Sequence, residues 1–88
     1  MKAIITVVGK DKSGIVAGVA TKIAELGLNI DDISQTVLEE FFTMMAVVSS
    51  DEKQDFTHLR NEFEVFGQTL NVKINIQSAA IFDAMYNI

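Results

Sequence analysis

The sequence has 88 residues, a formal net charge of −5 at pH 7 and no cysteine. This length allows one domain with a single core, which we assign to residues 1–88. The lack of cysteine excludes a disulfide scaffold and a thiolate nucleophile, and seven basic residues on an acidic chain argue against a nucleic-acid partner. No apolar run approaches the ~20 residues that cross a bilayer, so we expect no membrane partner and a cytoplasmic location.

The first two predicted elements are a strand and a helix joined by a short turn. The apolar run Ala3–Val8 predicts the strand. The helix is predicted over Gly14–Leu26, because apolar residues recur there at helical spacing, and Gly27 ends it. The turn at Gly9–Ser13 therefore leads to backbone N–H groups at the positive end of a helix, where a small carboxylate can bind.

Two strands follow in the middle of the chain. The first is predicted over Ile33–Leu38 and belongs at an edge of the sheet, because Asp32, Ser34 and Thr36 make one of its faces polar. The second, Phe41–Val48, is apolar on both faces, as is the first strand of the chain. Strands of this kind are buried on both faces, so we expect these two in the centre of the sheet.

The last regular elements are a second helix and a half-buried strand. Apolar residues from Phe56 to Leu70 form one helical stripe, which predicts a helix that ends at Asn71 and tolerates Gly67 at a cost of ~1 kcal/mol. Apolar and polar residues alternate over Val72–Gln77, which predicts a second edge strand. The members of the helical stripe are Phe56, Leu59, Phe63, Phe66 and Leu70.

The order of these elements predicts an α+β fold. A ferredoxin-like βαββαβ sandwich, with an antiparallel sheet in the order 4-1-3-2 and both helices on one face, satisfies the central and edge assignments. The other face of the central strands then carries apolar side chains that need a cover. We expect a short C-terminal helical tail, residues 79–88, to pack on the domain or on a partner subunit, and we expect a homodimer.

Residues suited to catalysis are sparse. The only histidine, His58, falls on the polar side of the second predicted helix, where a lone histidine is usually solvated. Adjacent acidic residues in strands point to opposite faces and cannot serve one substrate as an acid and a base. We therefore expect no enzyme activity, no metal and no cofactor. The adjacent acidic pairs are Asp31-Asp32, Glu39-Glu40 and Asp51-Glu52.

Two segments of the chain resemble the ACT domain family. They are Gly9-Lys10-Asp11-Lys12-Ser13-Gly14-Ile15-Val16-Ala17-Gly18-Val19 and Leu26-Gly27-Leu28-Asn29-Ile30-Asp31-Asp32, with Ser34-Gln35 shortly after the second. The chain is most similar to stand-alone bacterial members related to the glycine-cleavage-system repressor and to the amino-terminal module of formyltetrahydrofolate deformylase. The resemblance covers essentially the whole chain. It implies a regulatory module that binds amino acids or related small molecules, usually as a dimer with ligands at the subunit interface, and that acts through a protein partner not identified by the sequence.

The resemblance and the chemistry of the side chains select the same ligand-binding residues. The carboxylate of Asp11 can accept hydrogen bonds from a ligand ammonium, and Asn29 offers both a donor and an acceptor. Ser13 and the backbone N–H groups at the helix start can hold a ligand carboxylate. The predicted ligand-binding residues are Asp11, Ser13, Gly14, Ile15, Asn29 and Ile30.

These residues also allow purely structural roles. Asp11 or Ser13 can cap the first helix, and Asn29 can hold a turn through its own backbone. Many relatives carry proline where this chain has Ser13, so the turn here is expected to be less rigid. The sequence therefore leaves two alternative functions open. The first is a sensor of amino acids or similar small molecules that acts through a partner, and the second is a dimerisation and interaction module of the same fold without a ligand.

Overall fold

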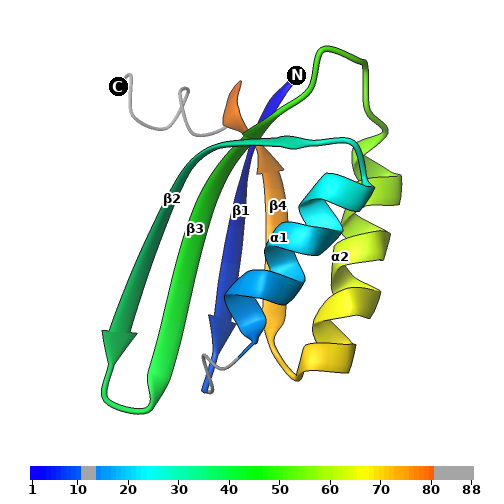
Figure 1. The fold of residues 1–88 in the computed structure, drawn as a ribbon. Helices are drawn as coiled ribbons and strands as arrows, with labels where there is room; N and C mark the ends of the chain where they lie inside the picture. Colours follow the sequence, from blue (N-terminus) through cyan, green and yellow to red (C-terminus); the bar gives the residue numbers. More distant parts are fainter. Residues whose placement is uncertain (11–13, 81–88) are drawn as a thin grey trace.

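Four antiparallel strands form one sheet, and two helices lie against one of its faces (Figure 1). The structure is a computed structural model that describes residues 1–10 and 14–80. In space the strand order is β2-β3-β1-β4, which confirms the predicted ferredoxin-like βαββαβ fold and its sheet order. The elements are β1 (Lys2–Gly9), α1 (Ile15–Glu25), β2 (Asn29–Leu38), β3 (Phe41–Ser49), α2 (Phe56–Leu70) and β4 (Lys73–Ser78).

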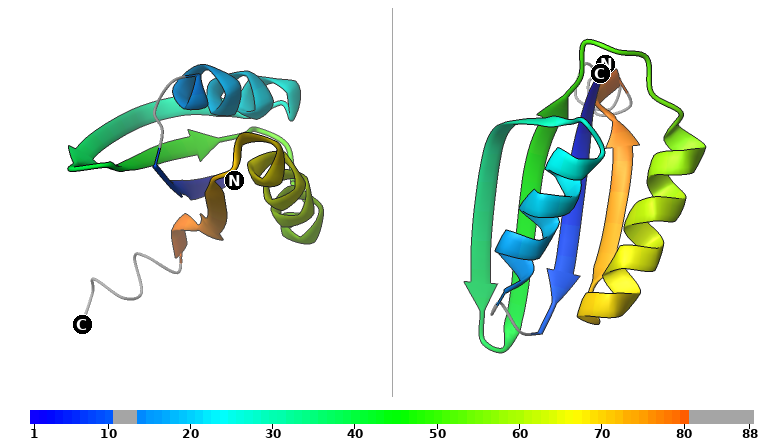
Figure 2. Two further views of the ribbon diagram at one scale, coloured as in Figure 1. Left: turned by 90° about the horizontal axis from the view of Figure 1, so that it is seen from below. Right: turned by 45° about the vertical axis from the view of Figure 1, so that its right-hand side comes forward.

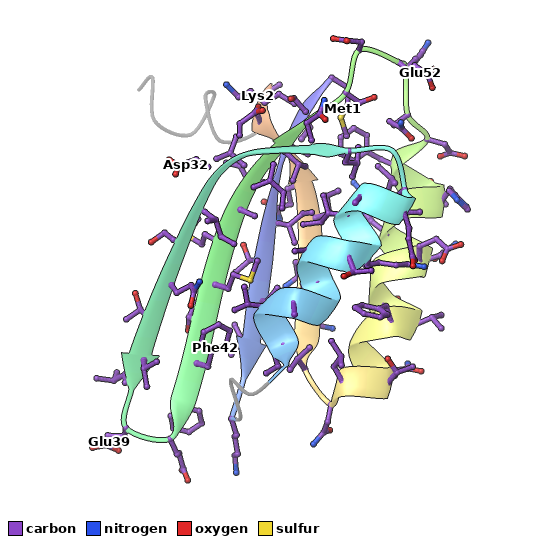
Figure 3. The ribbon with its side chains drawn as sticks, viewed as in Figure 1. Met1, Lys2, Asp32, Glu39, Phe42 and Glu52 are labelled. Atoms are coloured by element: carbon purple, nitrogen blue, oxygen red, sulfur yellow. The ribbon has the colours of Figure 1, made fainter. Side chains whose placement is uncertain are left out.

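The core lies between the sheet and the helix layer, and Figure 2 shows both helices on that side of the sheet. Every second residue of β1 and β3 points into this core, because neighbouring residues of a strand alternate between its two faces. Phe42, labelled in Figure 3, is only 1% exposed. The fully buried apolar side chains include Ala3, Ile5, Val7, Val19, Ile23, Met44, Ala46, Val48, Leu59 and Phe63.

Local sequence sets the ends of both helices. The carboxylate of Asp55 caps α2 by accepting hydrogen bonds from the N–H groups of Thr57, at 2.9 Å, and His58, at 3.4 Å. Asn71 ends α2 with a left-handed φ of 57°, and Gly27 follows α1 with a φ of 77°. The predicted ends of both helices are therefore confirmed.

Gly67 lies inside α2 because the helix passes close to the start of β4. A Cβ atom at this position would be 2.7 Å from the carbonyl oxygen of Val72 and 3.3 Å from Cγ1 of Ile74. A larger residue would force the backbone of the connection to move. Glycine thus allows the close approach of α2 to β4, at the cost of a weaker helix.

β2 begins at Asn29, earlier than the predicted start at Ile33. The added segment contains a β-bulge, because the register shifts between Ile30 and Asp32. Ile30 and Ile33 consequently lie on the same face of the sheet although they are three positions apart. The two-residue alternation by which a strand is recognised fails at the bulge, which explains why the prediction began too late.

The face of the sheet without helices is partly apolar, as predicted. Val8 of β1 and Met45 of β3 lie on it, with 44% and 43% of their surface exposed. The C-terminal helical tail that was predicted to pack on the domain or on a partner falls mainly on residues 81–88, outside the described residues. Its position therefore stays a prediction.

Candidate functional site

The first part of the candidate ligand site is the turn at the end of β1. β1 ends at Gly9, and α1 starts directly after Gly14, whose φ of 77° is left-handed. Glycine adopts this conformation at no steric cost. Among the described residues, nothing lies within 4 Å of the point where a Cβ of Gly14 would be, so the helix start is open. The predicted ligand residues Asp11 and Ser13 lie outside the described residues.

The first turn of α1 carries backbone donors that suit an anion. The N–H group of Gly18 donates to the carbonyl oxygen of Gly14 at 2.9 Å. The N–H groups of Ile15, Val16 and Ala17 precede this hydrogen bond, and no acidic side chain belongs to the first turn. Because the helix dipole adds partial positive charge at the same end, the turn can accept a carboxylate.

The N-cap position of α1 is occupied by neither Asp11 nor Ser13. The N-cap position of α1 belongs to Gly14, which has no side chain. A capping side chain normally comes from the N-cap residue itself and accepts from the second or third N–H of the helix. Asp11 and Ser13 precede that position and lie outside the described residues, so both their capping role and their ligand role stay predictions.

The second part of the candidate site, Asn29 and Ile30, lies at the opposite end of α1. These residues open β2, which follows the C-terminal end of the helix, whereas Gly14 precedes its N-terminal end (Figure 1). A helix of the length of Ile15–Glu25 spans about 16 Å. A molecule of the size of an amino acid cannot bridge this distance, so one chain does not bring Asn29 to Gly14.

β2 is exposed along its whole length, which the sequence analysis did not predict. Its apolar side chains on the helix side of the sheet are Ile30, Ile33 and Val37, exposed by 40%, 37% and 54%. Lysine, arginine and proline, which usually protect an edge strand, do not occur between Asn29 and Glu40. Their absence from a ten-residue edge was the signal in the sequence that indicates an interaction surface.

Carboxylates stand at both ends of this edge. Figure 3 shows Asp32 near the start of β2 and Glu39 at the hairpin that follows it. Asp31 accepts a hydrogen bond from the hydroxyl of Ser49 at 3.0 Å, and Asp32 accepts one from the N–H of Ile33 at 2.9 Å. The β2 edge is therefore acidic as well as partly apolar.

The ionisable side chains between the helices have a structural role. The ammonium of Lys22 donates to the carboxylate of Glu62 at 3.0 Å and links α1 to α2. This hydrogen bond, and next the positive charge of Lys22, hold the pKa of Glu62 below its ordinary value. His58 is largely exposed, with Nε2 3.9 Å from the same carboxylate.

Residues 1–10 and 14–80 contain neither a metal-binding cluster nor a membrane-spanning helix. No group of three histidine, aspartate or glutamate side chains there is arranged to hold a metal ion. In the same part of the chain, no helix combines the length and the apolar character needed to cross a membrane.

The sequence and the fold match known proteins over nearly the whole chain. The family model of the ACT domain matches residues 2–77. An ACT domain protein from Streptococcus pneumoniae is 92% identical to this chain, and its solved structure has a TM-score of 0.91 over 98% of each chain.

Two more distant solved structures share the fold. Formyltetrahydrofolate deformylase from Burkholderia mallei is 18% identical with a TM-score of 0.78, over 90% of this chain and 28% of that protein. A protein described as a "putative glycine cleavage system transcriptional repressor", also 18% identical with a TM-score of 0.78, matches over 86% of this chain and 45% of its own. The predicted resemblance is thus confirmed, and the chain belongs to the ACT domain family.

Proposed function

We propose that this protein binds a free α-amino acid, or a close analogue, and reports its presence to a partner protein in the cytoplasm. ACT domains are in general regulatory modules that bind small molecules. The single observation that carries the proposal is the start of α1, where Gly14 opens the turn and none of the residues in the first helical turn is acidic. A carboxylate is the simplest ligand for such a helix end.

The proposed ligand lies with its carboxylate toward the N–H groups of Gly14 and Ile15. The hydroxyl of Ser13 assists there, and the carboxylate of Asp11 accepts hydrogen bonds from the ligand ammonium. Asn29 completes the site as donor and acceptor, beside the apolar side chain of Ile30. This set distinguishes an amino acid from a simple anion, because it includes a group for the ammonium.

The site is proposed to form between two copies of the chain, because α1 separates Gly14 from Asn29 within one copy. The register supports this arrangement: Gly9 and Val37 both pair with Phe42, so β2 finishes at the same end of the sheet as the turn before Gly14. Antiparallel pairing of two β2 strands about a two-fold axis would bring Asn29 of the second copy to that end of the sheet.

The exposed edge supports a homodimer of this kind. β2 is long and exposed on both faces, and within the described residues it pairs only with β3, which leaves the backbone donors and acceptors of its outer side free. Its exposed Ile30, Ile33 and Val37 would become buried against the second copy. Dimer formation would also stabilise a domain whose small size limits its core.

A thermal-shift screen against the common amino acids, followed by calorimetry on any hit, tests the proposed ligand class. A ligand at a hundred times its dissociation constant adds ~2.7 kcal/mol to the folded state, which is a large effect for a domain of this size. We expect a small subset of amino acids to raise the melting temperature and inorganic phosphate to leave it unchanged.

The alternative function is a dimerisation and interaction module of the same fold without a ligand. The exposed β2 edge favours this second function independently of the helix start. If no amino acid binds while the protein remains dimeric, the alternative replaces the sensor. In both cases we propose a protein that is not an enzyme.

A further inference from the structure

A groove runs along the outer side of β4, at the opposite edge of the sheet from β2. It has a volume of about 240 Å³ and is lined by five consecutive residues of the strand, Lys73–Gln77, together with Arg60 and Glu64 of α2. Strand residues advance by ~3.3 Å, so the groove follows the edge for about 13 Å. Pockets that enclose drug-sized molecules usually measure ~300–1,000 Å³. This groove is smaller than that and follows the edge of the strand, which suits a strip of extended chain.

The backbone of β4 can bind such a strip. In the described part of the sheet β4 pairs only with β1, so the N–H and carbonyl groups on its other side face the groove. An extended peptide that pairs with them adds a strand to the sheet, and its main-chain hydrogen bonds do not depend on its sequence. Specificity must therefore come from the side chains that line the groove.

The charges along the groove alternate in sign. α2 and β4 run in opposite directions (Figure 1), and Gly67 lies against Val72 and Ile74 at the start of β4. Glu64 and Arg60 precede Gly67 by about 4.5 Å and about 10.5 Å along the helix axis. At ~3.3 Å per strand residue, Glu64 lies beside Ile74 and Asn75, and Arg60 beside Ile76. Lys73 stands one position before Ile74, so the order along the groove is positive, negative, positive.

The three charges are available to a partner. Arg60, Glu64 and Lys73 are exposed, and none of them forms an ion pair with another described residue. The guanidinium of Arg60 lies 5.8 Å from the centre of the Phe56 ring, a cation–π contact that restricts its position. Cations are scarce on this acidic chain, and two of its seven basic residues line this one groove.

We propose that the β4 groove binds an extended peptide of a partner protein, with an acidic residue for Arg60, a basic residue for Glu64 and an acidic residue for Lys73. Side chains two positions apart on a strand are ~6.6 Å apart on one face, close to the ~6 Å between Glu64 and Arg60 on their helix. Ile74 and Ile76 point to the helix side and Lys73 to the open face. An antiparallel peptide with the sequence Glu-Thr-Lys-Glu satisfies all three charges. Its first glutamate lies opposite Ile76 and points toward Arg60, its lysine lies opposite Ile74 and points toward Glu64, and its last glutamate lies opposite Lys73.

The probe is a fluorescein-labelled synthetic peptide, Thr-Val-Glu-Thr-Lys-Glu-Val-Thr, blocked at both ends and titrated with the whole chain at low ionic strength. We expect saturable binding by fluorescence anisotropy. Arg60→Glu and Lys73→Glu should each weaken binding about tenfold, as expected for the loss of one charged hydrogen bond. Lys53→Glu, which makes the same charge change outside the groove, should change it by less than about twofold.

Two controls separate strand addition from general charge effects. A peptide N-methylated at the amides that pair with β4 should not bind, because its main chain cannot donate to the strand. A peptide with lysine in place of its first glutamate should bind Arg60→Glu better than the original peptide does. The proposal is overturned if the peptide does not bind at millimolar protein. It is also overturned if the N-methylated peptide binds as well as the original and the lysine-substituted peptide binds Arg60→Glu no better than the original does.

A second copy of this chain is the other possible occupant, through its acidic β2 edge. If Arg60→Glu and Lys73→Glu abolish self-association, the groove belongs to an interface between copies and the peptide proposal is wrong. The groove and Asn29 lie at opposite edges of the sheet, so this experiment and the amino-acid screen can fail independently.

Discussion

Asp11 and Asn29 are the residues on which the proposed ligand depends most. A charged hydrogen bond lost from such a site costs ~1.5–3 kcal/mol. Asp11→Ala and Asn29→Ala should therefore each weaken amino-acid binding roughly ten- to a hundredfold in a calorimetric titration. Neither change should unfold the protein, because Asn29 is exposed and the N-cap position of α1 belongs to Gly14.

Ser13→Ala is the matched control for these two variants, because a hydroxyl that only assists a carboxylate contributes less than a charged group. It should weaken binding less than either of them. A ligand whose affinity is the same in the wild type, Asp11→Ala and Asn29→Ala would mean that the ligand binds elsewhere.

Gly67 gives a second test at the level of a single residue. In most exposed helix positions alanine is more stabilising than glycine by ~1 kcal/mol. Here the added methyl would meet the carbonyl oxygen of Val72, and overpacking of this kind costs ~1–3 kcal/mol. Gly67→Ala should therefore lower the free energy of unfolding by on the order of 1 kcal/mol in urea melts, while Gln68→Ala, one position along and exposed, should shift it by less than about 0.5 kcal/mol.

The strands differ in how well the sequence predicts them. β1 and β3 are recognisable as central because both faces are apolar, and β4 as an edge because its residues alternate. The bulge near Asp31 hides the first residues of β2, since an inserted residue shifts the period. The exposure of β2 was also missed, because it depends on where α1 packs, which is a tertiary property.

The sequence also left the geometry of the candidate site open, for a similar reason. The local pattern identifies Gly14 as a helix start and Asn29 as the start of a strand. Neither pattern says that the whole length of α1 separates the two residues within one chain. That separation is a property of the three-dimensional fold, to which a local sequence pattern gives no direct access.

The contact between the two helices should make stability depend on pH. Lys22 lowers the pKa of Glu62 in the folded state below its ordinary value of 4.5. A carboxyl of this kind contributes stability that is present above the unfolded-state pKa and is lost as the pH falls through the folded-state pKa. Glu62→Gln should lower the urea midpoint at neutral pH, and the difference from wild type should shrink on acidification. A difference that grows toward acidic pH would contradict this assignment.

At the scale of the whole molecule, the exposed β2 edge predicts a homodimer. Sedimentation equilibrium at micromolar concentration should give about twice the mass of the chain. Ile33→Lys should yield monomers, because a lysine that points from an edge strand opposes pairing with another strand. Val65→Lys adds the same charge at an apolar residue of α2 that is 61% exposed, and this control should remain dimeric. A monomeric wild type would rule out the homodimer.

The separation of Gly14 and Asn29 by the length of α1 has a consequence for mixtures of variants. If every ligand site takes Asp11 from one copy and Asn29 from the other, an Asp11→Ala chain and an Asn29→Ala chain are each defective alone. In their heterodimer, one site combines both lesions and the other contains neither. Mixing the two purified variants under conditions of subunit exchange should therefore restore full-affinity binding at half of the heterodimer sites, an intersubunit complementation that a site within one chain could not produce.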